Sequence, residues 1–255
     1  ELTGMYMIMR WRRRYDQRQA DRSDGCADPW HGTGTYATQC KKYFGNMNIE
    51  GVEIDEKITD LSRKYFSLSE DIPVTTYDGR AFLNASQKTY DVIMVDAYQD
   101  ITIPFQMSSK EFFELVKSHL KDDGVMVVNM NMRGMKEGNI NQYLSDTIGS
   151  VFDTAVTVDV AGSSNRELFA SDDSDIVKNL TKHTGELTNV NLKNMMQEVT
   201  SNLTEYQKGN YILTDDQAPV ELLGMQVIDE LIKDEVQYYK DIYKEQGIKG
   251  LIESL

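Results

Sequence analysis

The sequence is poor in the residues that build disulfide frameworks and zinc sites. It contains two cysteines, Cys26 and Cys40, which do not form a closely spaced pair. Its three histidines, His31, His119 and His183, stand far apart and show no ligand spacing. We therefore expect neither a disulfide-stabilised fold nor a metal site, and the cysteine content favours a reducing compartment.

Long apolar runs and an excess of positive charge are also lacking. No run approaches the roughly 20 apolar residues that a membrane-spanning helix needs, so this chain is not expected to cross a bilayer. The formal net charge is -14, which argues against nucleic-acid binding because phosphates require a cationic face. The acidity is compatible with a cationic small substrate and equally with plain solubility.

What the sequence does contain, from residue 48 to residue 171, is an alternation of strand and helix patterns. The run 90–98, "YDVIMVDAY", has an unbroken apolar centre, which is typical of a strand buried on both faces of a parallel sheet. Ser108 and Glu111 form a capping-box pattern ahead of an amphipathic helix that we expect to stop at Asp122–Gly124. The pattern predicts a doubly wound α/β sheet. The expected strands are 48–55, 72–79, 90–98, 125–132, 154–160 and 166–171, and the expected helices are 56–66, 107–124 and about 139–152.

Acids and glycines stand where the predicted parallel strands end, which is where open sheets of this kind bind ligands. Gly32 and Gly34 lie in a glycine-rich turn, "HGTGTYATQC", and Glu53 follows at about the 20-residue interval that places a carboxylate on a ribose diol. Asp78 with Gly79 ends the next strand, and Asp96 ends the strand after that. The alternative is that these acids only cap helices and end strands.

The stretches "GTGTYATQCKKYFGNMNIEGVEID", "YDGRAF" and "YDVIMVDAY" resemble the spermidine synthase (polyamine aminopropyltransferase) family. "ILTDDQAPVE" is similar to a branch of that family often fused to membrane segments. The resemblance covers most of residues 32–225 and implies a Rossmann-like methyltransferase sheet of seven strands with a helical C-terminal cap. It also implies binding of decarboxylated S-adenosylmethionine or S-adenosylmethionine as co-substrate, without a metal.

The resemblance assigns roles to particular positions. The glycine turn would approach the aminopropyl end of the nucleoside, Glu53 would hold the ribose hydroxyls, and Asp78 would accept from the adenine amino group. Asp96 would face the reacting centre and help to anchor the amine. The cofactor-binding residues that the resemblance implies are Gly32, Gly34, Thr35, Glu53, Ile54, Asp78, Gly79 and Asp96.

The expected catalytic residues are Asp96, Tyr98 and Asp100, and here the sequence departs from the family pattern. Family members carry Asp-x-x-Asp, whereas the second acid of this chain comes one residue late. Asp215, Asp216 or Glu221 could supply a carboxylate from the C-terminal side, or serve only in a turn and a cap. The family's N-terminal β-hairpin has no match.

The leading interpretation is aminopropyl transfer to a polyamine such as putrescine. An S-adenosylmethionine-dependent methyltransferase and a non-catalytic nucleoside-binding domain stay open as alternatives. We expect a cytoplasmic location, or the cytoplasmic face of a membrane if the chain is a fragment. A homodimer and a membrane-spanning region ahead of Glu1 are compatible with the resemblance.

Residues 7 to 32 do not read like the rest of the chain, because no buried strand precedes the glycine turn. Family-like codons read in a shifted frame give residues 7–12 and 27–32 as they stand here. We interpret this segment as a frame-slipped translation, the alternative being a divergent N-terminus. The expected organisation is an aberrant segment 1–32, a nucleoside-binding core 33–171 and a helical extension 172–255 that packs on the core.

Overall fold

A computed structural model describes residues 34–44, 47–96, 103–131, 136–160 and 165–254, together with the backbone of 25–28. Most of the segment interpreted as frame-slipped therefore lies outside the described residues. In chain order the elements are β1 (Gly25–Asp28), α2 (Thr35–Phe44), β2 (Asn48–Glu53), α3 (Glu56–Tyr65), β3 (Val74–Thr76), α4 (Gly79–Ala85), β4 (Tyr90–Val95), η2 (Phe105–Met107), α5 (Lys110–Ser118), β5 (Leu120–Met130), α6 (Ile140–Val151), β6 (Thr154–Asp159), β7 (Arg166–Ser171), α7 (Ile176–Glu186), α8 (Val190–Asn202), β8 (Thr204–Glu205) and α9 (Val220–Ser254).

The strands form one mixed sheet in the order β3-β2-β1-β4-β5-β7-β6-β8. Strands β1 to β5 pair in parallel, and β7, β6 and β8 continue the sheet in antiparallel pairs. The α/β prediction is confirmed, with the two-residue β8 added at one edge of the seven expected strands. Since β1 lies between β2 and β4, the carboxyl ends of β1 to β5 meet at one edge of the sheet, called the ligand edge below.

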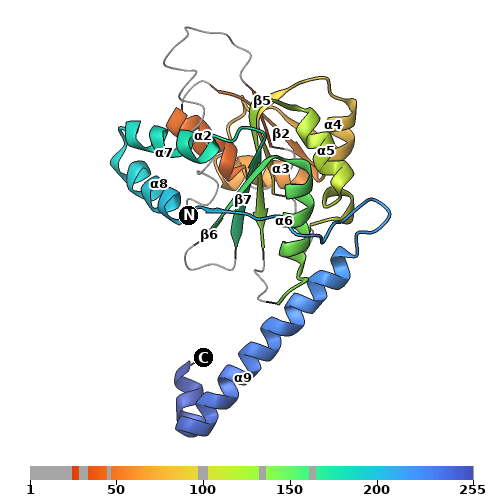
Figure 1. The fold of residues 1–255 in the computed structure, drawn as a ribbon. Coiled ribbons are helices and arrows are strands. Elements are labelled where there is room, and N and C mark those ends of the chain that lie inside the picture. Colours follow the sequence, from red (N-terminus) through yellow and green to blue (C-terminus); the bar gives the residue numbers. More distant parts are fainter. Residues whose placement is uncertain are drawn as a thin grey trace.

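Helices cover both faces of the sheet, as Figure 1 shows. Alternate residues of the central strand β4 point to opposite faces. Val92 and Met94 join a core that includes residues of α2, α7 and α8, whereas Ile93 and Val95 join a core built with α4, α5 and α6. Full burial of one such side chain stabilises the fold by about 1.5–3 kcal/mol, which explains the unbroken apolar run.

The start and the end of α5 differ from the sequence-based expectation. Ser109, not Ser108, caps the helix by accepting from the Phe112 amide at 3.2 Å, while the Ser108 hydroxyl donates to the Phe105 carbonyl. The helix ends at Ser118, and Asp122–Gly124 falls inside β5 at the point where the pairing of β5 with β4 shifts register. The extra residues are thus absorbed as a bulge in the strand rather than as a turn.

A buried carboxylate holds the first part of the connection from α8 to α9. Asp146 of α6 is fully buried and accepts from the Tyr206 hydroxyl at 2.6 Å and from the backbone amides of Gly209 and Tyr211 at 2.8 and 3.0 Å. A β-carbon at residue 209 would lie 2.6 Å from Oδ2 of Asp146, so the close approach requires glycine. Burial, and then the hydrogen bond to Asp146, raises the pKa of the Tyr206 hydroxyl.

Among the described residues, helix α9 packs on the core at its start. Val220, Leu223 and Val227 are buried, and Glu230 pairs with Lys136 at 2.9 Å. Beyond that point the helix extends away from the body (Figure 1), leaving large apolar side chains exposed, among them Leu231, Ile232, Val236, Tyr238, Tyr243, Ile248 and Ile252. In the part of the chain that the structure describes, no helix is both long and apolar enough for a membrane crossing.

Candidate functional site

The glycine turn leads directly into α2 at the ligand edge. Gly34 is buried and adopts φ +69°, a conformation that side chains with a β-carbon rarely tolerate. Its carbonyl accepts from the Thr38 amide at 3.0 Å, and α2 begins at the exposed Thr35. The first amides of α2 therefore face the region beyond the strand ends, where a helix start favours electron-rich groups. Gly32 lies outside the described residues.

The two acids after β2 do different things. Glu53 is only 4% exposed, and its Oε1 accepts from the Asp55 amide at 3.1 Å. Asp55 caps α3 by accepting from the Lys57 amide, so its carboxylate serves the helix. Ile54 between them is 62% exposed. The strand end thus presents a buried carboxylate next to an exposed apolar side chain.

The end of β3 is tied to the end of β2. The amide of Tyr77 donates to the Glu53 carbonyl at 3.1 Å, which brings the neighbouring Asp78 to the same part of the ligand edge. Asp78 caps α4 through Oδ1, which accepts from the Ala81 amide at 2.8 Å, and Gly79 is buried at the first position of the helix. A carboxylate has about four acceptor positions, so this cap leaves Asp78 able to accept from a ligand as well.

Asp96 follows the last residue of β4 and is exposed. Its Oδ1 accepts from the Asn129 side chain at 3.1 Å, and Asn129 in turn accepts from the Asn165 side chain at 3.2 Å. A row of polar side chains therefore runs from β4 across β5 to the start of β7. Tyr98 and Asp100, the other expected catalytic residues, lie outside the described residues.

Sequence analysis missed an ionisable side chain in this region. Glu167 of β7 is 2% exposed, and its Oε2 has no hydrogen-bond partner among the described residues. Burial, then the nearby charge of Asp96, raises the pKa of Glu167 well above the ordinary value of a glutamate. The sequence does hold a signal for this residue. Glu167 is a charged residue inside the predicted strand 166–171, directly before the apolar run from residue 168 to residue 170.

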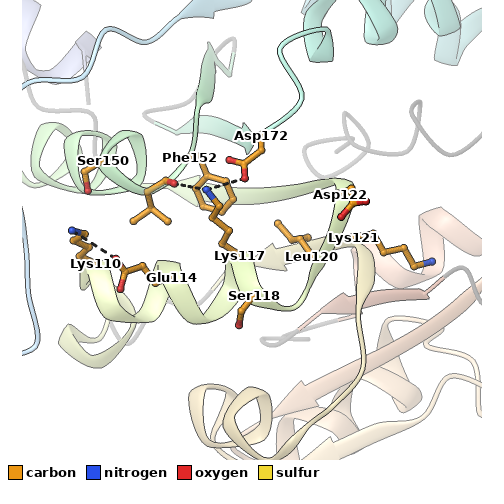
Figure 2. Close-up of a pocket in the computed structure, with 12 residues that line it drawn as sticks. Lys110, Glu114, Lys117, Ser118, Leu120, Lys121, Asp122, Ser150, Phe152 and Asp172 are labelled. Carbon is orange, nitrogen blue, oxygen red and sulfur yellow. Dashed lines mark hydrogen bonds and ion pairs between the residues drawn. The ribbon is translucent and has the colours of Figure 1, made fainter.

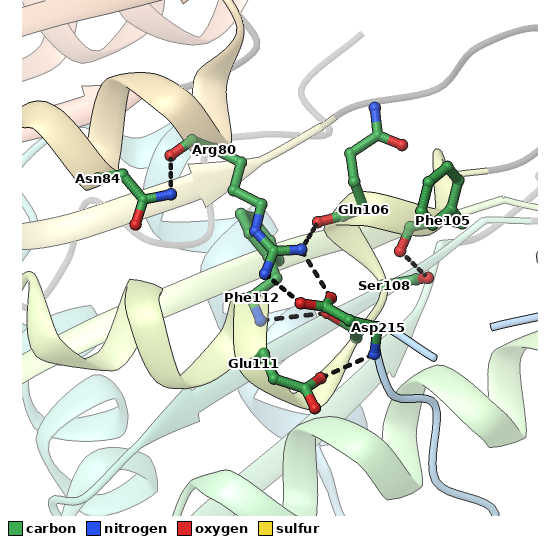
Figure 3. Close-up of polar contacts among 9 residues, drawn as sticks. Arg80, Asn84, Phe105, Gln106, Ser108, Glu111, Phe112 and Asp215 are labelled. Carbon is green, nitrogen blue, oxygen red and sulfur yellow. Dashed lines mark hydrogen bonds and ion pairs between the residues drawn. The ribbon is translucent and has the colours of Figure 1, made fainter. Parts of the chain in front are cut away.

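The acids of the "TDDQAPVE" segment are not equivalent. The carboxylate of Asp215 accepts hydrogen bonds from Nη1 and Nη2 of Arg80, at 2.7 and 2.6 Å, and from the Ser109 hydroxyl at 2.5 Å. Arg80 also donates to the Gln106 carbonyl at 2.8 Å, and the Asp215 amide donates to Glu111 at 3.0 Å (Figure 3). Asp215 thus links α4, η2, α5 and the segment before α9. Asp216 and Glu221 are exposed.

A separate cavity of about 640 Å³ lies along α5, from Lys110 to Ser118, beside the end of α6 and the edge of the sheet where β5 begins (Figure 2). The ammonium of Lys117 in its wall donates to the Val151 carbonyl at 2.8 Å and pairs with Asp172 at 2.8 Å. Because the strand ends that gather the acids lie on the opposite edge, this cavity is distinct from the candidate site.

The strand order, the glycine turn and the acids at the ends of β2, β3 and β4 define a Rossmann-like protein of the methyltransferase fold. A model of the spermine/spermidine synthase domain matches residues 32–163, about half of the chain, and the chain belongs to this family. The resemblance inferred from the sequence is confirmed.

Curated relatives agree with this assignment. A probable polyamine aminopropyl transferase of Bifidobacterium longum is 50% identical over 276 aligned positions, which cover 100% of this chain and 60% of the relative. A polyamine aminopropyltransferase of Methanocaldococcus jannaschii is 29% identical over 102 positions, covering 38% of this chain and 35% of the relative. The chain therefore spans less than two thirds of the length of either relative.

Solved structures share the fold at low identity. A probable spermidine synthase from Corynebacterium glutamicum aligns with a TM-score of 0.58 at 19% identity, covering 82% of this chain and 81% of that chain. Human methyltransferase-like protein 13, in complex with SAH, aligns with a TM-score of 0.59 at 18% identity, covering 84% and 98%. These similarities confirm the predicted fold.

Proposed function

We propose that this chain is an aminopropyltransferase that binds decarboxylated S-adenosylmethionine and alkylates a small polyamine such as putrescine. The observation that carries the proposal is the convergence of Glu53, Asp78 and Asp96 at the carboxyl ends of three parallel strands, beside the Gly34 turn. Membership of the spermine/spermidine synthase family supports it.

The nucleoside half of the site would use the ends of β2 and β3. Glu53 would accept from the two ribose hydroxyls, because a single carboxylate can take two adjacent donors. Asp78 would accept from the adenine amino group while Ile54 contacts the ring, and the turn at Gly34 lets the backbone approach the aminopropyl end without a side chain in the way. The fit rests on a buried acceptor, an exposed apolar neighbour and a glycine that leaves space.

The amine half would use Asp96. In the transfer the amine nitrogen attacks the carbon next to the sulfonium, the new C–N bond forms, and the C–S bond breaks with its electron pair going to sulfur. The chain must hold a protonated amine, accept one proton and aim the free amine at that carbon. Asp96 is exposed and accepts from the Asn129 side chain, and we infer that it would hold the ammonium. Tyr98 and Asp100 stay predicted partners.

Isothermal calorimetry with decarboxylated S-adenosylmethionine, S-adenosylmethionine and methylthioadenosine tests the proposal. Preference for the decarboxylated form, with turnover of putrescine, supports it. Preference for the carboxylated form points to methyl transfer, which the structural similarity to methyltransferase-like protein 13 makes the second candidate. Absence of binding to all three leaves a non-catalytic domain and overturns the proposal.

Asp96→Asn should abolish turnover while sparing nucleoside binding. The matched control is Asp91→Asn, because Asp91 lies on the same strand at the opposite edge, where it pairs with Lys121 at 2.7 Å. The control should leave both nucleoside affinity and turnover of the folded protein unchanged.

Four expectations from the sequence stay predictions. They are the division of the chain at residues 32 and 171, the homodimer, the cytoplasmic location and the membrane region ahead of Glu1.

A further inference from the structure

A carboxyl group buried without a partner is unfavourable, because the charged form loses its hydration and gains nothing in return. Glu167 is in this position: its side chain is 2% exposed and its Oε2 has no partner among the described residues. The neighbours along β7, Leu168 and Ala170, are apolar and fully buried. Packing alone would favour an apolar residue at this position, so the carboxyl group is better explained by the binding of a ligand.

The fold places Glu167 at the ligand edge beside Asp96. Because β7 runs antiparallel to β5, the start of β7 lies at the same edge as the ends of β4 and β5. Glu167 is paired in register with Asn129 of β5, and the Asn129 side chain is the one that bonds Asp96. Asp96 and Glu167 therefore flank Asn129, and the charge of Asp96 is the second cause, after burial, of the raised pKa of Glu167.

Among the described residues, the register partners of Glu167 and the adjacent cation do not neutralise its charge. Its register partner on β6 is Val158 and its partner on β5 is Asn129, neither of which is ionisable. The adjacent cation, Arg166, is engaged with Asp159 through its Nε at 2.6 Å. Among the described residues Glu167 therefore has no cationic partner, and a buried carboxyl group of this kind is suited to a ligand that brings its own positive charge.

We propose that Glu167 and Asp96 together bind the ammonium end of the amine substrate, and that Glu167 accepts the proton which the amine must lose. This inference rests on the proposed function and names the second acid of the amine site, which the altered spacing of Asp96 and Asp100 left unassigned. The ammonium passes one proton to the Glu167 carboxylate, the neutral amine forms the C–N bond, and the thioether leaves with the electrons of the C–S bond. The product amine keeps the positive charge.

The environment of Glu167 suits a proton acceptor. Burial and the charge of Asp96 raise the pKa of Glu167, and a base is most effective when its pKa lies near the working pH. A bound ammonium favours the ionised carboxylate of Glu167, so amine binding and loss of the Glu167 proton are coupled. Activity should therefore fall as the pH is lowered through the raised pKa.

Glu167→Gln keeps the size of the side chain and removes its basicity. We expect kcat to fall about 100- to 10,000-fold, with the affinity for decarboxylated S-adenosylmethionine unchanged. The acidic limb of the kcat/KM profile should disappear, whereas Glu167→Asp should retain part of the activity and the limb. Glu205→Gln, an exposed glutamate on β8 of the same sheet, is the control and should behave like the wild-type chain.

Two results separate this inference from the proposed function. If the wild-type chain transfers aminopropyl groups but Glu167→Gln has the same kcat and pH profile, Glu167 has no part in the reaction and the inference fails alone. If the wild-type chain has no turnover, putrescine binding is measured by calorimetry in buffers of different ionisation enthalpy. Proton release on binding that Glu167→Gln abolishes supports the carboxyl pair, and identical proton release in both chains overturns it.

Discussion

Arg80 and Asp215 lie 135 positions apart in the sequence and are joined by two hydrogen bonds, from Nη1 to Oδ1 at 2.7 Å and from Nη2 to Oδ2 at 2.6 Å. Arg80 follows the cap of α4 by two residues, and Asp215 precedes α9. The pair therefore connects the expected adenine side of the site to the C-terminal segment. Paired, two-point contacts of this kind fix orientation as well as attract.

Asp215→Asn should lower the free energy of unfolding by about 1–2 kcal/mol, a modest value because the carboxylate is partly exposed. Donation by Arg80, then by Ser109, holds the pKa of Asp215 below the ordinary aspartate value. The stabilisation should be present above the unfolded-state pKa of about 3.9 and lost as the pH falls through the lowered pKa. Urea unfolding at pH 7 and at acidic pH measures the effect, and Asp216→Asn, at the exposed neighbour, should cause none.

Asp146→Asn should destabilise the chain more than Asp215→Asn. The buried carboxylate accepts from one hydroxyl and two amides, and an asparagine would turn an NH₂ group towards one of those donors. We expect a loss of about 2–4 kcal/mol, measured by urea unfolding. Asp153→Asn, at an exposed aspartate after α6, is the control, and equal losses in both variants would contradict the assigned role.

Glu53→Gln should weaken nucleoside binding about 10- to 100-fold, because hydrogen bonds from hydroxyls to a charged acceptor contribute about 1.5–3 kcal/mol. The protein should stay folded, which circular dichroism checks. Glu50→Gln is the matched control on the same strand, since Glu50 instead accepts from Tyr90 and Lys88. Calorimetry with methylthioadenosine measures both affinities, and equal weakening in the two variants would remove Glu53 from the site.

Ending the chain after Glu230 should leave the melting temperature nearly unchanged, because the side chains of α9 beyond that residue are mostly exposed. Val227→Ala should instead lower the free energy of unfolding by about 1–3 kcal/mol, since Val227 is 1% exposed. Differential scanning calorimetry on both variants makes the comparison. A large loss on truncation would show that the far part of α9 packs on the core.

The parts of the fold that the sequence predicts are those with a local periodic signal. The apolar centre of 90–98 and the alternation up to residue 171 are enough for the order and type of β4 to β7, because burial on two faces leaves a distinct pattern. The two residues of β8 carry no such pattern and are both exposed. The sequence also does not predict that α9 extends away from the core, because an exposed apolar stripe and a core-facing apolar stripe have the same sequence pattern.

The sequence predicts a site residue only where the residues next to it in the sequence reveal its position in the fold. Glu53, Asp78 and Asp96 stand directly after strands, so topology alone brings them to one edge. Glu167 and Arg80 gain their meaning from partners that are distant in sequence, Asp96 and Asp215 respectively. No local pattern in a single sequence marks such pairs.

Helix α9 leaves the core at the ligand edge, because Glu230 pairs with Lys136, which follows the end of β5. At 1.5 Å per residue, Tyr243 lies about 35 Å along the helix from Val220. A fluorophore attached to a cysteine at position 243 could therefore exchange energy with a fluorescent adenosine analogue held near Glu53. Energy transfer between the two fluorophores would report ligand binding without a label on the protein at the binding site itself.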